Sequence, residues 1–254
     1  MGKIIAIVNQ KGGVAKTTTA INLSAAVAQR GHKTLLVDLD PQGNASSGLG
    51  IDRRQVEHCV YDMLINDAPI EAVLLHTEYD NLDLIPATIQ LAGAEVELVS
   101  AISRENRLRK ILRPQREQYD FVFIDCPPSL GLLTVNALSA ADCALLPLQC
   151  EYYALEGVTQ LLSTYEMIRK NLNPELEIEG VLLTMYDART NLSSQVAEEA
   201  RHYFGPKVYQ TQISRSVRLS EAPSHGMPGI VYDPKSRGAE EYQSLAEEFL
   251  AHQR

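Results

Sequence analysis

The sequence has no long hydrophobic run and no recognisable export signal. In its 254 residues, no apolar stretch approaches the roughly 18 residues that a membrane-spanning helix needs. After Met1 the sequence continues as Gly2-Lys3-Ile4, without the basic region, apolar stretch and small-residue cleavage site of a signal peptide. These absences argue against an integral membrane protein and against a secreted one, so we expect a cytoplasmic location.

Cysteine and positive charge are both scarce. The four cysteines, at positions 59, 126, 143 and 150, lack the C-x-x-C spacing of metal and redox sites, and we expect reduced thiols that pack as small hydrophobic residues. The 32 acidic residues outnumber the 23 basic ones and give a net charge of −9. This balance excludes a generally basic surface, so any contact with DNA must come from a local patch.

The chain also lacks internal repeats, low-complexity tracts and linkers rich in proline, glycine or serine that would mark a domain boundary. Hydrophobic residues make up 45% of the composition, which is enough for one sizeable core. We therefore expect a single domain that spans residues 1–254.

What the sequence does contain is an alternation of short apolar runs and helical patterns. The runs predict strands at 3–8, 34–40, 82–87, 120–126, 143–149, 178–186 and 207–213. The spacing of apolar residues predicts helices at 17–30, 154–170, 192–204 and 239–252. Several runs, such as 121–124, are apolar without alternation, so both faces of the sheet must be covered. The order predicts an α/β fold with a doubly wound, mostly parallel sheet flanked by helices on both faces.

A glycine-rich turn joins the first predicted strand to the first predicted helix. Residues 11–18 read Lys-Gly-Gly-Val-Ala-Lys-Thr-Thr, which is typical of a phosphate-binding loop. In such a loop, backbone N–H groups surround the β-phosphate, Lys16 reaches the β- and γ-oxygens and Thr17 joins the Mg²⁺ shell. The general G-x-x-x-x-G-K-[ST] pattern is not met in full, because Gln10 and Ala15 stand where it has glycine. A hairpin turn is the alternative, but it leaves the Lys-Thr-Thr run unexplained.

Three aspartates, Asp38, Asp40 and Asp125, lie at the carboxyl ends of predicted strands. An open parallel sheet binds ligands at that edge, so we expect these side chains to converge with the phosphate loop on one crevice. Ordinary strand-end or turn residues before Pro41 and Pro127 are the alternative interpretation.

Several segments together carry a family resemblance. Residues 11–18, 37–44 and 125–128 resemble, in order, the nucleotide motifs of the ParA/MinD superfamily of deviant Walker A ATPases, whose mark is the extra Lys11 ahead of the glycines. Three later segments are similar to the chromosomal ParA branch, namely 150–157, 184–190 and 217–224. The resemblance implies a P-loop NTPase fold, ATP or ADP with Mg²⁺ as ligands, and ATP hydrolysis.

The resemblance also implies roles for single residues. Lys16 neutralises charge on the transferred phosphoryl group, and Asp40 orients or activates the attacking water. Thr17 binds Mg²⁺ directly and Asp125 holds it through water. The implied nucleotide-binding set is Lys11, Gly12, Gly13, Val14, Ala15, Lys16, Thr17, Thr18, Met185, Ser214 and Ser216.

Three cations imply partners. In the family, the lysine that corresponds to Lys11 reaches the phosphates of a neighbouring subunit, so that ATP drives homodimerisation and hydrolysis weakens it. Arg189 and Arg218 correspond to positions that touch the phosphate backbone of double-stranded DNA, which implies non-specific, salt-dependent and nucleoid-associated binding. A ParB-like protein would stimulate hydrolysis. Solvated surface cations are the alternative interpretation of all three.

The chain departs from the family pattern at two places. Ala15 stands where the family has glycine, and Ser214-Arg215-Ser216 stands where it commonly has Pro-Arg-Asn beside the adenine. A methyl group at position 15 would crowd the β-phosphate or strain the loop if its φ is positive. Both a natural difference and an introduced substitution that traps one state fit this departure.

The leading prediction is an ATPase that partitions chromosomes or plasmids, and three alternatives stand beside it. A MinD-like membrane regulator needs a basic C-terminal helix, whereas residues 239–252 carry four glutamates mostly opposite an apolar face. An iron–sulfur ATPase needs a pair of bridging cysteines, which this spacing does not offer. In the third alternative, Ala15 has removed hydrolysis and leaves a DNA-binding scaffold.

Overall fold

The computed structural model describes residues 2–151 and 154–253, with only the backbone for 154–159, and this part forms one eight-stranded sheet in the order β3-β4-β2-β5-β1-β6-β7-β8. The strands are β1 (Lys3–Ile7), β2 (Thr34–Asp38), β3 (Leu75–His76), β4 (Leu82–Ile85), β5 (Phe121–Asp125), β6 (Cys143–Gln149), β7 (Glu177–Tyr186) and β8 (Ile213–Ser214). All neighbouring pairs are parallel except β3 and β4. The mostly parallel sheet is as predicted.

The helices connect and cover these strands. They are α1 (Lys16–Gln29), α2 (Asn44–Gly48), α3 (Val60–Ile65), α4 (Leu91–Glu97), α5 (Arg107–Leu112), α6 (Leu132–Ala140), α7 (Ala154–Asn171), α8 (Asn191–Phe204), α9 (Val217–Glu221), α10 (Gly229–Tyr232) and α11 (Arg237–His252). Single 3₁₀ turns are η1 (Ile70–Ala72), η2 (Leu98–Ser100), η3 (Arg104–Asn106), η4 (Arg113–Glu117), η5 (Gly205–Lys207) and η6 (Ala222–His225).

Six of the seven predicted strands and all four predicted helices are confirmed to within two residues at each end. The strand predicted at 207–213 is wrong, because this segment forms only an isolated bridge at Val208 before the two-residue β8. The reason is a side chain of α11: Glu248 accepts the N–H groups of Gln210 and Thr211 at 2.6 and 2.9 Å. Those donors are therefore not available to a strand ladder.

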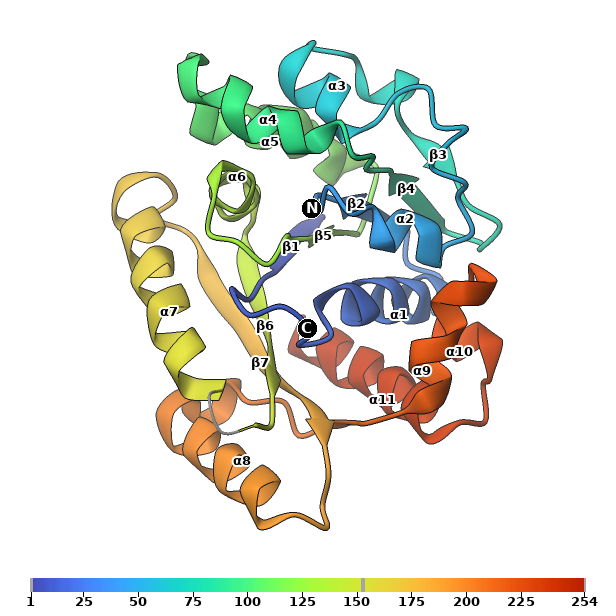
Figure 1. Ribbon diagram of the computed structural model, residues 1–254, viewed down its shortest axis with the longest axis vertical. Helices are drawn as coiled ribbons and strands as arrows, with labels where there is room; N and C mark the ends of the chain where they lie inside the picture. Colours follow the sequence, from blue (N-terminus) through green and yellow to red (C-terminus); the bar gives the residue numbers. More distant parts are fainter. Residues whose placement is uncertain (1, 152–153, 254) are drawn as a thin grey trace.

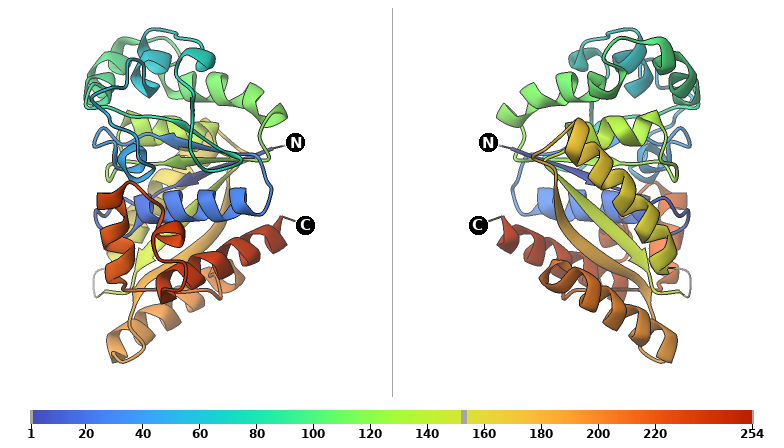
Figure 2. Two further views of the ribbon diagram at one scale, coloured as in Figure 1. Left: turned by 90° about the vertical axis from the view of Figure 1, so that its right-hand side faces the viewer. Right: turned by 90° about the vertical axis from the view of Figure 1, so that its left-hand side faces the viewer.

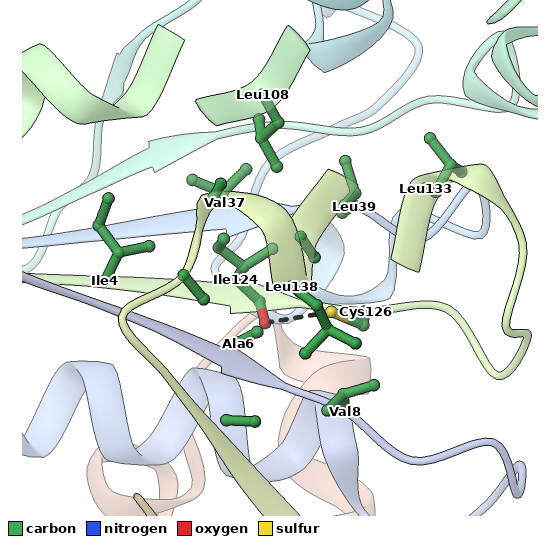
Figure 3. Packing of buried hydrophobic residues seen from close by; sticks show 14 of the residues in the cluster. Ile4, Ala6, Val8, Val37, Leu39, Leu108, Ile124, Cys126, Leu133 and Leu138 are labelled. Atoms are coloured by element: carbon green, nitrogen blue, oxygen red, sulfur yellow. Dashed lines mark hydrogen bonds between the residues drawn. The ribbon is translucent and has the colours of Figure 1, made fainter. Parts of the chain in front are cut away.

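Helices lie on both faces of the sheet, so the fold is doubly wound (Figures 1 and 2). Helices α1 and α11 pack on one face, whereas α3 to α8 contribute to the core on the other. Within β1 the side chains alternate between the two cores: Ile4 and Ala6 face the α3–α8 layer (Figure 3), and Ile5 and Ile7 face α1 and α11. Burial on both sides explains the unbroken apolar runs in the sequence.

The strand register brings the predicted aspartates to one edge. In the parallel pairs, Ile7 of β1 lies opposite Asp125 of β5, and Asp125 lies opposite Asp38 of β2. The loop that follows β1 therefore starts beside two strand-end carboxylates. The expectation that these groups share the carboxyl edge of the sheet is confirmed.

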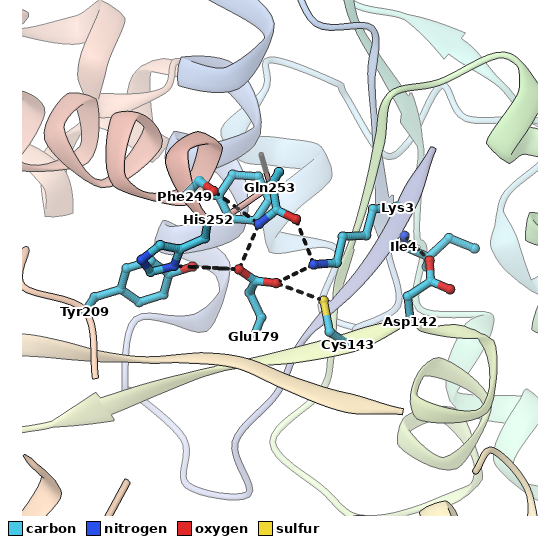
Figure 4. Close-up of polar contacts among 9 residues, drawn as sticks. All are labelled: Lys3, Ile4, Asp142, Cys143, Glu179, Tyr209, Phe249, His252 and Gln253. Atoms are coloured by element: carbon cyan, nitrogen blue, oxygen red, sulfur yellow. Dashed lines mark hydrogen bonds and ion pairs between the residues drawn. The ribbon is translucent and has the colours of Figure 1, made fainter. Parts of the chain in front are cut away.

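The opposite end of the sheet, where β1 and β7 begin, holds a partly buried polar network (Figure 4). Lys3 donates to Glu179 at 2.7 Å and to Gln253 at 2.7 Å, and Gln253 donates back to Glu179 at 2.8 Å. Burial alone would raise the pKa of Glu179, but the Lys3 ammonium holds it below its ordinary value. The network ties the start of β1 to β7 and to the residue that follows α11.

All four cysteines are free and buried. Burial raises the pKa of the Cys126 and Cys143 thiols above its ordinary value, and that of Cys150 to about 12. These three thiols are therefore protonated and inert, and the burial of all four cysteines agrees with their predicted role as packing residues. Every helix within residues 2–151 and 154–253 is too short or too polar to cross a membrane.

Candidate nucleotide-binding site

The loop between β1 and α1 leaves its backbone N–H groups available. Gly13 and Ala15 both adopt positive φ, 73° and 64°. Among the described residues, none accepts a hydrogen bond from the N–H groups of residues 12–18. Helix α1 also begins without a side-chain cap. Consecutive free donors at the N-terminus of a 14-residue helix form a site for an anion.

Ala15 is the residue immediately before α1, with φ 64° and ψ 30°. This left-handed conformation costs an alanine about 1 kcal/mol relative to glycine. Its carbonyl accepts the N–H of Thr19 at 2.9 Å, which starts the helix. The methyl group therefore does not prevent the loop shape, but it does place strain where the family has glycine.

Lys16 is buried at the centre of the loop. Its Nζ donates to the carbonyl of Lys11 at 2.9 Å. Burial lowers the pKa of Lys16, and the carboxylates of Asp125 and Asp40 act in the opposite direction. An ammonium that lies within the influence of two carboxylates and beside free N–H groups is well placed to meet a polyphosphate and its metal ion.

The three predicted aspartates differ in their bonding. Asp38 is fully buried and accepts both the N–H and the hydroxyl of Ser46, at 2.8 and 2.7 Å; burial raises its pKa to about 6. Asp40 accepts only the N–H of Gln42, at 2.9 Å, so one of its oxygens is free of protein donors in the described part of the chain. Asp38 is thus a structural anchor, whereas Asp40 retains an oxygen for a ligand or water.

Asp125 is the least satisfied polar group of the site. It is fully buried, and neither of its carboxylate oxygens has a hydrogen-bond partner among the described residues. Burial raises the pKa of Asp125 well above its ordinary value, as does the Asp38 carboxylate, while the Lys16 ammonium lowers it. An orphaned carboxylate beside the first turn of α1 fits a hydrated Mg²⁺ ion.

The described residues contain no group of three or more His, Cys, Asp or Glu that is arranged to hold a metal ion. This agrees with the way in which Mg²⁺ binds beside phosphates, where one or two protein groups, water and phosphate oxygens complete its shell. Thr17 and Asp125 therefore fit magnesium as partial ligands rather than as a closed protein cage.

Five residues of the predicted nucleotide-binding set line one pocket next to the loop: Ala15, Thr18, Met185, Ser214 and Ser216. The pocket is completed by residues that the sequence did not indicate, among them Tyr242 of α11, whose hydroxyl bonds Thr19 at 3.0 Å. The sequence showed Tyr242 only as part of an apolar helix face. The pocket brings together residues more than 200 positions apart in the sequence. It is a candidate site for the base of a nucleotide, and we call it the base pocket.

Met185 lines this pocket and has an unusual backbone conformation. Its φ is 51°, and the pairing of β7 with β8 shifts register between Thr184 and Tyr186. The Thr184 hydroxyl donates to the carbonyl of Val14 at 3.2 Å, which links the end of β7 to the phosphate loop. Left-handed torsions in a methionine are strained and cluster at functional sites.

Lys11 is the first residue of the phosphate loop, and its side chain pairs with a carboxylate of its own chain. Its Nζ lies 3.5 Å from Glu151, and the same carboxylate lies 3.6 Å from Arg215. The reach of Lys11 to a second subunit stays a prediction. Residues 152–153 of the family-like segment 150–157 lie outside the described residues.

The two arginines predicted to contact DNA are not among the residues that line the base pocket. Arg189 follows β7 and forms two bonds to Asp187, at 2.9 and 2.8 Å. Arg218, in α9, pairs with Glu221 at 3.0 Å and Asp233 at 3.3 Å. Both side chains are mainly exposed, so each is accessible but already neutralised by carboxylates.

The chain is similar to known partitioning proteins. A family model described as an AAA domain matches residues 2–178. The sporulation initiation inhibitor protein Soj of Bacillus subtilis (strain 168) is 63% identical over 252 residues, covering 99% of this chain and 100% of that protein. The chromosome partitioning protein ParA of Myxococcus xanthus (strain DK1622) is 56% identical over 250 residues, covering 98% and 88%.

A solved structure agrees in fold. The crystal structure of cobyrinic acid a,c-diamide synthase from Mycobacterium smegmatis with bound ADP and magnesium has a TM-score of 0.88 and 39% identity, and the match covers 100% of this chain and 96% of that one. Its name denotes another enzyme, but its identity is lower than that of the partitioning relatives. With the free N–H groups, Lys16 and Asp125 at one edge of a doubly wound sheet, these matches show that the chain belongs to the ParA/MinD family of ATPases, as a Soj-like member.

Proposed function

We propose that this chain is a chromosome- or plasmid-partitioning ATPase in which Mg·ATP drives the formation of a sandwich dimer that binds DNA without sequence preference. The observation that carries the proposal is the meeting of free N–H groups, the Lys16 ammonium and the unpartnered Asp125 carboxylate at one point. The similarity to Soj and ParA supports the cellular role. A ParB-like protein stimulates hydrolysis and returns the dimer to monomers on the nucleoid.

In this proposal the loop residues bind the phosphates and the carboxylates organise water. The N–H groups of residues 12–18 hold the β-phosphate, and Lys16 exchanges the Lys11 carbonyl for phosphate oxygens. When bound, Mg²⁺ neutralises charge between the β- and γ-phosphates. Thr17 and Asp125 would hold this ion, and the free oxygen of Asp40 accepts a hydrogen bond from the attacking water.

Dimerisation and DNA binding follow from the exposed cations. Lys11 leaves Glu151 to reach the phosphates of a second copy, so the γ-phosphate supplies the negative charge between two basic loops. Arg189 and Arg218 exchange their carboxylate partners for DNA phosphates, and a dimer doubles their number. A MinD-like membrane role is the second candidate, but α11 uses Glu248 to bind the backbone and exposes Glu240 and Glu247, which anionic lipid repels.

Replacing Lys16 by alanine tests the proposal. We expect Lys16→Ala to abolish Mg·ATP binding in titration calorimetry, because no other loop side chain of the same chain can place a positive charge between the β- and γ-phosphates. The matched control is Lys33→Ala, which removes an exposed lysine outside the loop. Unchanged ATP binding by Lys16→Ala would refute the site. A phosphate-release assay with and without DNA separates a working ATPase from a scaffold that Ala15 has made inactive.

A further inference from the structure

Helix α11 supplies the carboxylates that hold the segment lining the base pocket. Glu241 accepts the N–H of Ser214 at 2.7 Å and its hydroxyl at 2.7 Å. About two turns further on the same face, Glu248 accepts the N–H groups of Gln210 and Thr211, which precede β8. Figure 1 shows α11 running beside α1 and α9. Side chains of α11 thus hold residues 210–214, although this helix begins more than 20 residues later in the sequence.

The bond to Glu241 determines what the Ser214 hydroxyl can offer a ligand. A carboxylate only accepts hydrogen bonds, so the single hydrogen of the hydroxyl is committed to Glu241. Arg237 donates to the same carboxylate oxygen at 2.8 Å and holds it in place. Among the described residues, none donates to the Ser214 oxygen. Its remaining lone pairs can therefore accept a hydrogen bond from a ligand in the pocket that Ser214 lines.

The hydroxyl of Ser216 has the opposite hydrogen-bonding role. Its oxygen accepts the N–H of Leu219 at 3.4 Å at the start of α9. In the described part of the chain, no group accepts the hydrogen of this hydroxyl, so it remains a donor. The two serines therefore present one acceptor and one donor to the same pocket.

We propose that Glu241 selects 6-amino purines over 6-oxo purines by fixing Ser214 as an acceptor; this inference rests on the proposed binding of a purine nucleotide. Adenine offers an amino donor at C6 and a ring-nitrogen acceptor beside it, which matches the pair of serines. A 6-oxo base places a carbonyl lone pair against the Ser214 lone pair. Glu241 is a positioning residue, because it acts on the base through Ser214.

The test compares Mg·ATP with Mg·ITP, which has a carbonyl at C6. Dissociation constants for both are measured by calorimetry in the parent chain, Glu241→Gln, Ser214→Ala and the control Glu240→Gln, which removes the same charge from an exposed position of α11. The glutamine amide can donate to Ser214, which frees the hydroxyl to turn and donate to a carbonyl. We expect the dissociation constant for ITP divided by that for ATP to fall about tenfold in Glu241→Gln and in Ser214→Ala. The same ratio should stay unchanged in the control.

The outcomes separate this inference from the proposed function. Binding of ATP and ITP with equal affinity by the parent chain would refute the selection by Glu241 and leave the ATP site intact. An unchanged ratio in Ser214→Ala, which leaves α11 untouched, would refute it even if Glu241→Gln failed to fold. Absence of binding of either nucleotide by the parent would refute the proposed function and this inference together. A shift of both affinities by the same factor in Glu241→Gln would assign Glu241 a purely structural role.

Discussion

Replacing Ala15 by glycine tests how the departure from the family pattern affects the protein. The φ of 64° costs alanine about 1 kcal/mol, and glycine removes this strain. Glycine also increases the entropy of the unfolded chain, which costs about 0.4–1 kcal/mol. The two effects nearly cancel. We therefore expect Ala15→Gly to change the thermal midpoint of the nucleotide-free protein by no more than about 3 °C.

The larger effect of Ala15→Gly should appear in ATP binding and in the proposed ATP-bound dimer. We expect the loop to keep the left-handed Ala15 of this structure in both the free and the bound protein, so that its strain cancels in the binding equilibrium. What remains is crowding by the methyl group, which lines the pocket beside Thr18. We expect ATP affinity to rise by less than about tenfold, equivalent to 1.4 kcal/mol. Dimer formation, DNA binding and turnover should rise together, because in the proposed dimer Lys11 of a second copy enters the same space.

Calorimetry with Mg·ATP, gel filtration and phosphate release measure these three quantities. The control is Ala92→Gly, on the exposed side of α4, which should lower stability by up to about 1 kcal/mol without affecting nucleotide binding. The reasoning is refuted if Ala15→Gly matches the parent chain in affinity, dimer fraction and hydrolysis. That result would mean that the loop accommodates the methyl group in every state.

The remaining predictions concern the carboxylates and the cations. Asp40→Ala should keep ATP binding but stall hydrolysis and leave more dimer in gel filtration with ATP; a monomer that holds ATP would contradict the sandwich mechanism. Arg189→Ala and Arg218→Ala should each reduce the logarithmic salt slope of DNA binding by about 0.9 per lost phosphate contact without loss of dimer, and equal loss of both would mean a structural role. Lys3→Ala should lower the free energy of unfolding by about 2 kcal/mol at pH 7.5, because the buried Glu179 loses its Lys3 partner and keeps only its bonds to groups such as Tyr209 and Gln253. Burial then raises the folded pKa of Glu179, so the deficit should shrink as the pH falls through it; a deficit equal at pH 5 and 7.5 in denaturant unfolding would contradict the charge argument.

The sequence predicted the sheet well because buried parallel strands need apolar residues on both faces, and such runs stand out. It missed β3, which has only two residues, Leu75 and His76. It placed a strand at 207–213, where apolar and β-branched residues gave the right local pattern. That segment is held by Glu248, and a side-chain acceptor 37 residues away leaves no periodic signal.

The phosphate loop was predictable because its chemistry is contiguous: glycines, a lysine and two threonines lie between a strand and a helix. The base pocket was only partly predictable. Met185, Ser214 and Ser216 came from family resemblance, whereas Tyr242 and Glu241 belong to a helix that reads as a surface element. Their role depends on tertiary contact between α1, β8 and α11, which no local pattern encodes.

The acidic net charge and the proposed binding of polyanions are reconciled by the pairing of the exposed cations. Lys11 and Arg215 share Glu151, Arg189 binds Asp187, and Arg218 has two carboxylate partners. Each of these cations is thus held in a pair that is weak because it is exposed to solvent. A phosphate that binds one of these exposed cations must displace a carboxylate rather than meet a free cation, which lowers affinity in a single chain. In the proposed dimer, two chains present these cations to one polyanion and many simultaneous contacts offset the cost of displacing each carboxylate, so we expect binding to depend steeply on dimerisation.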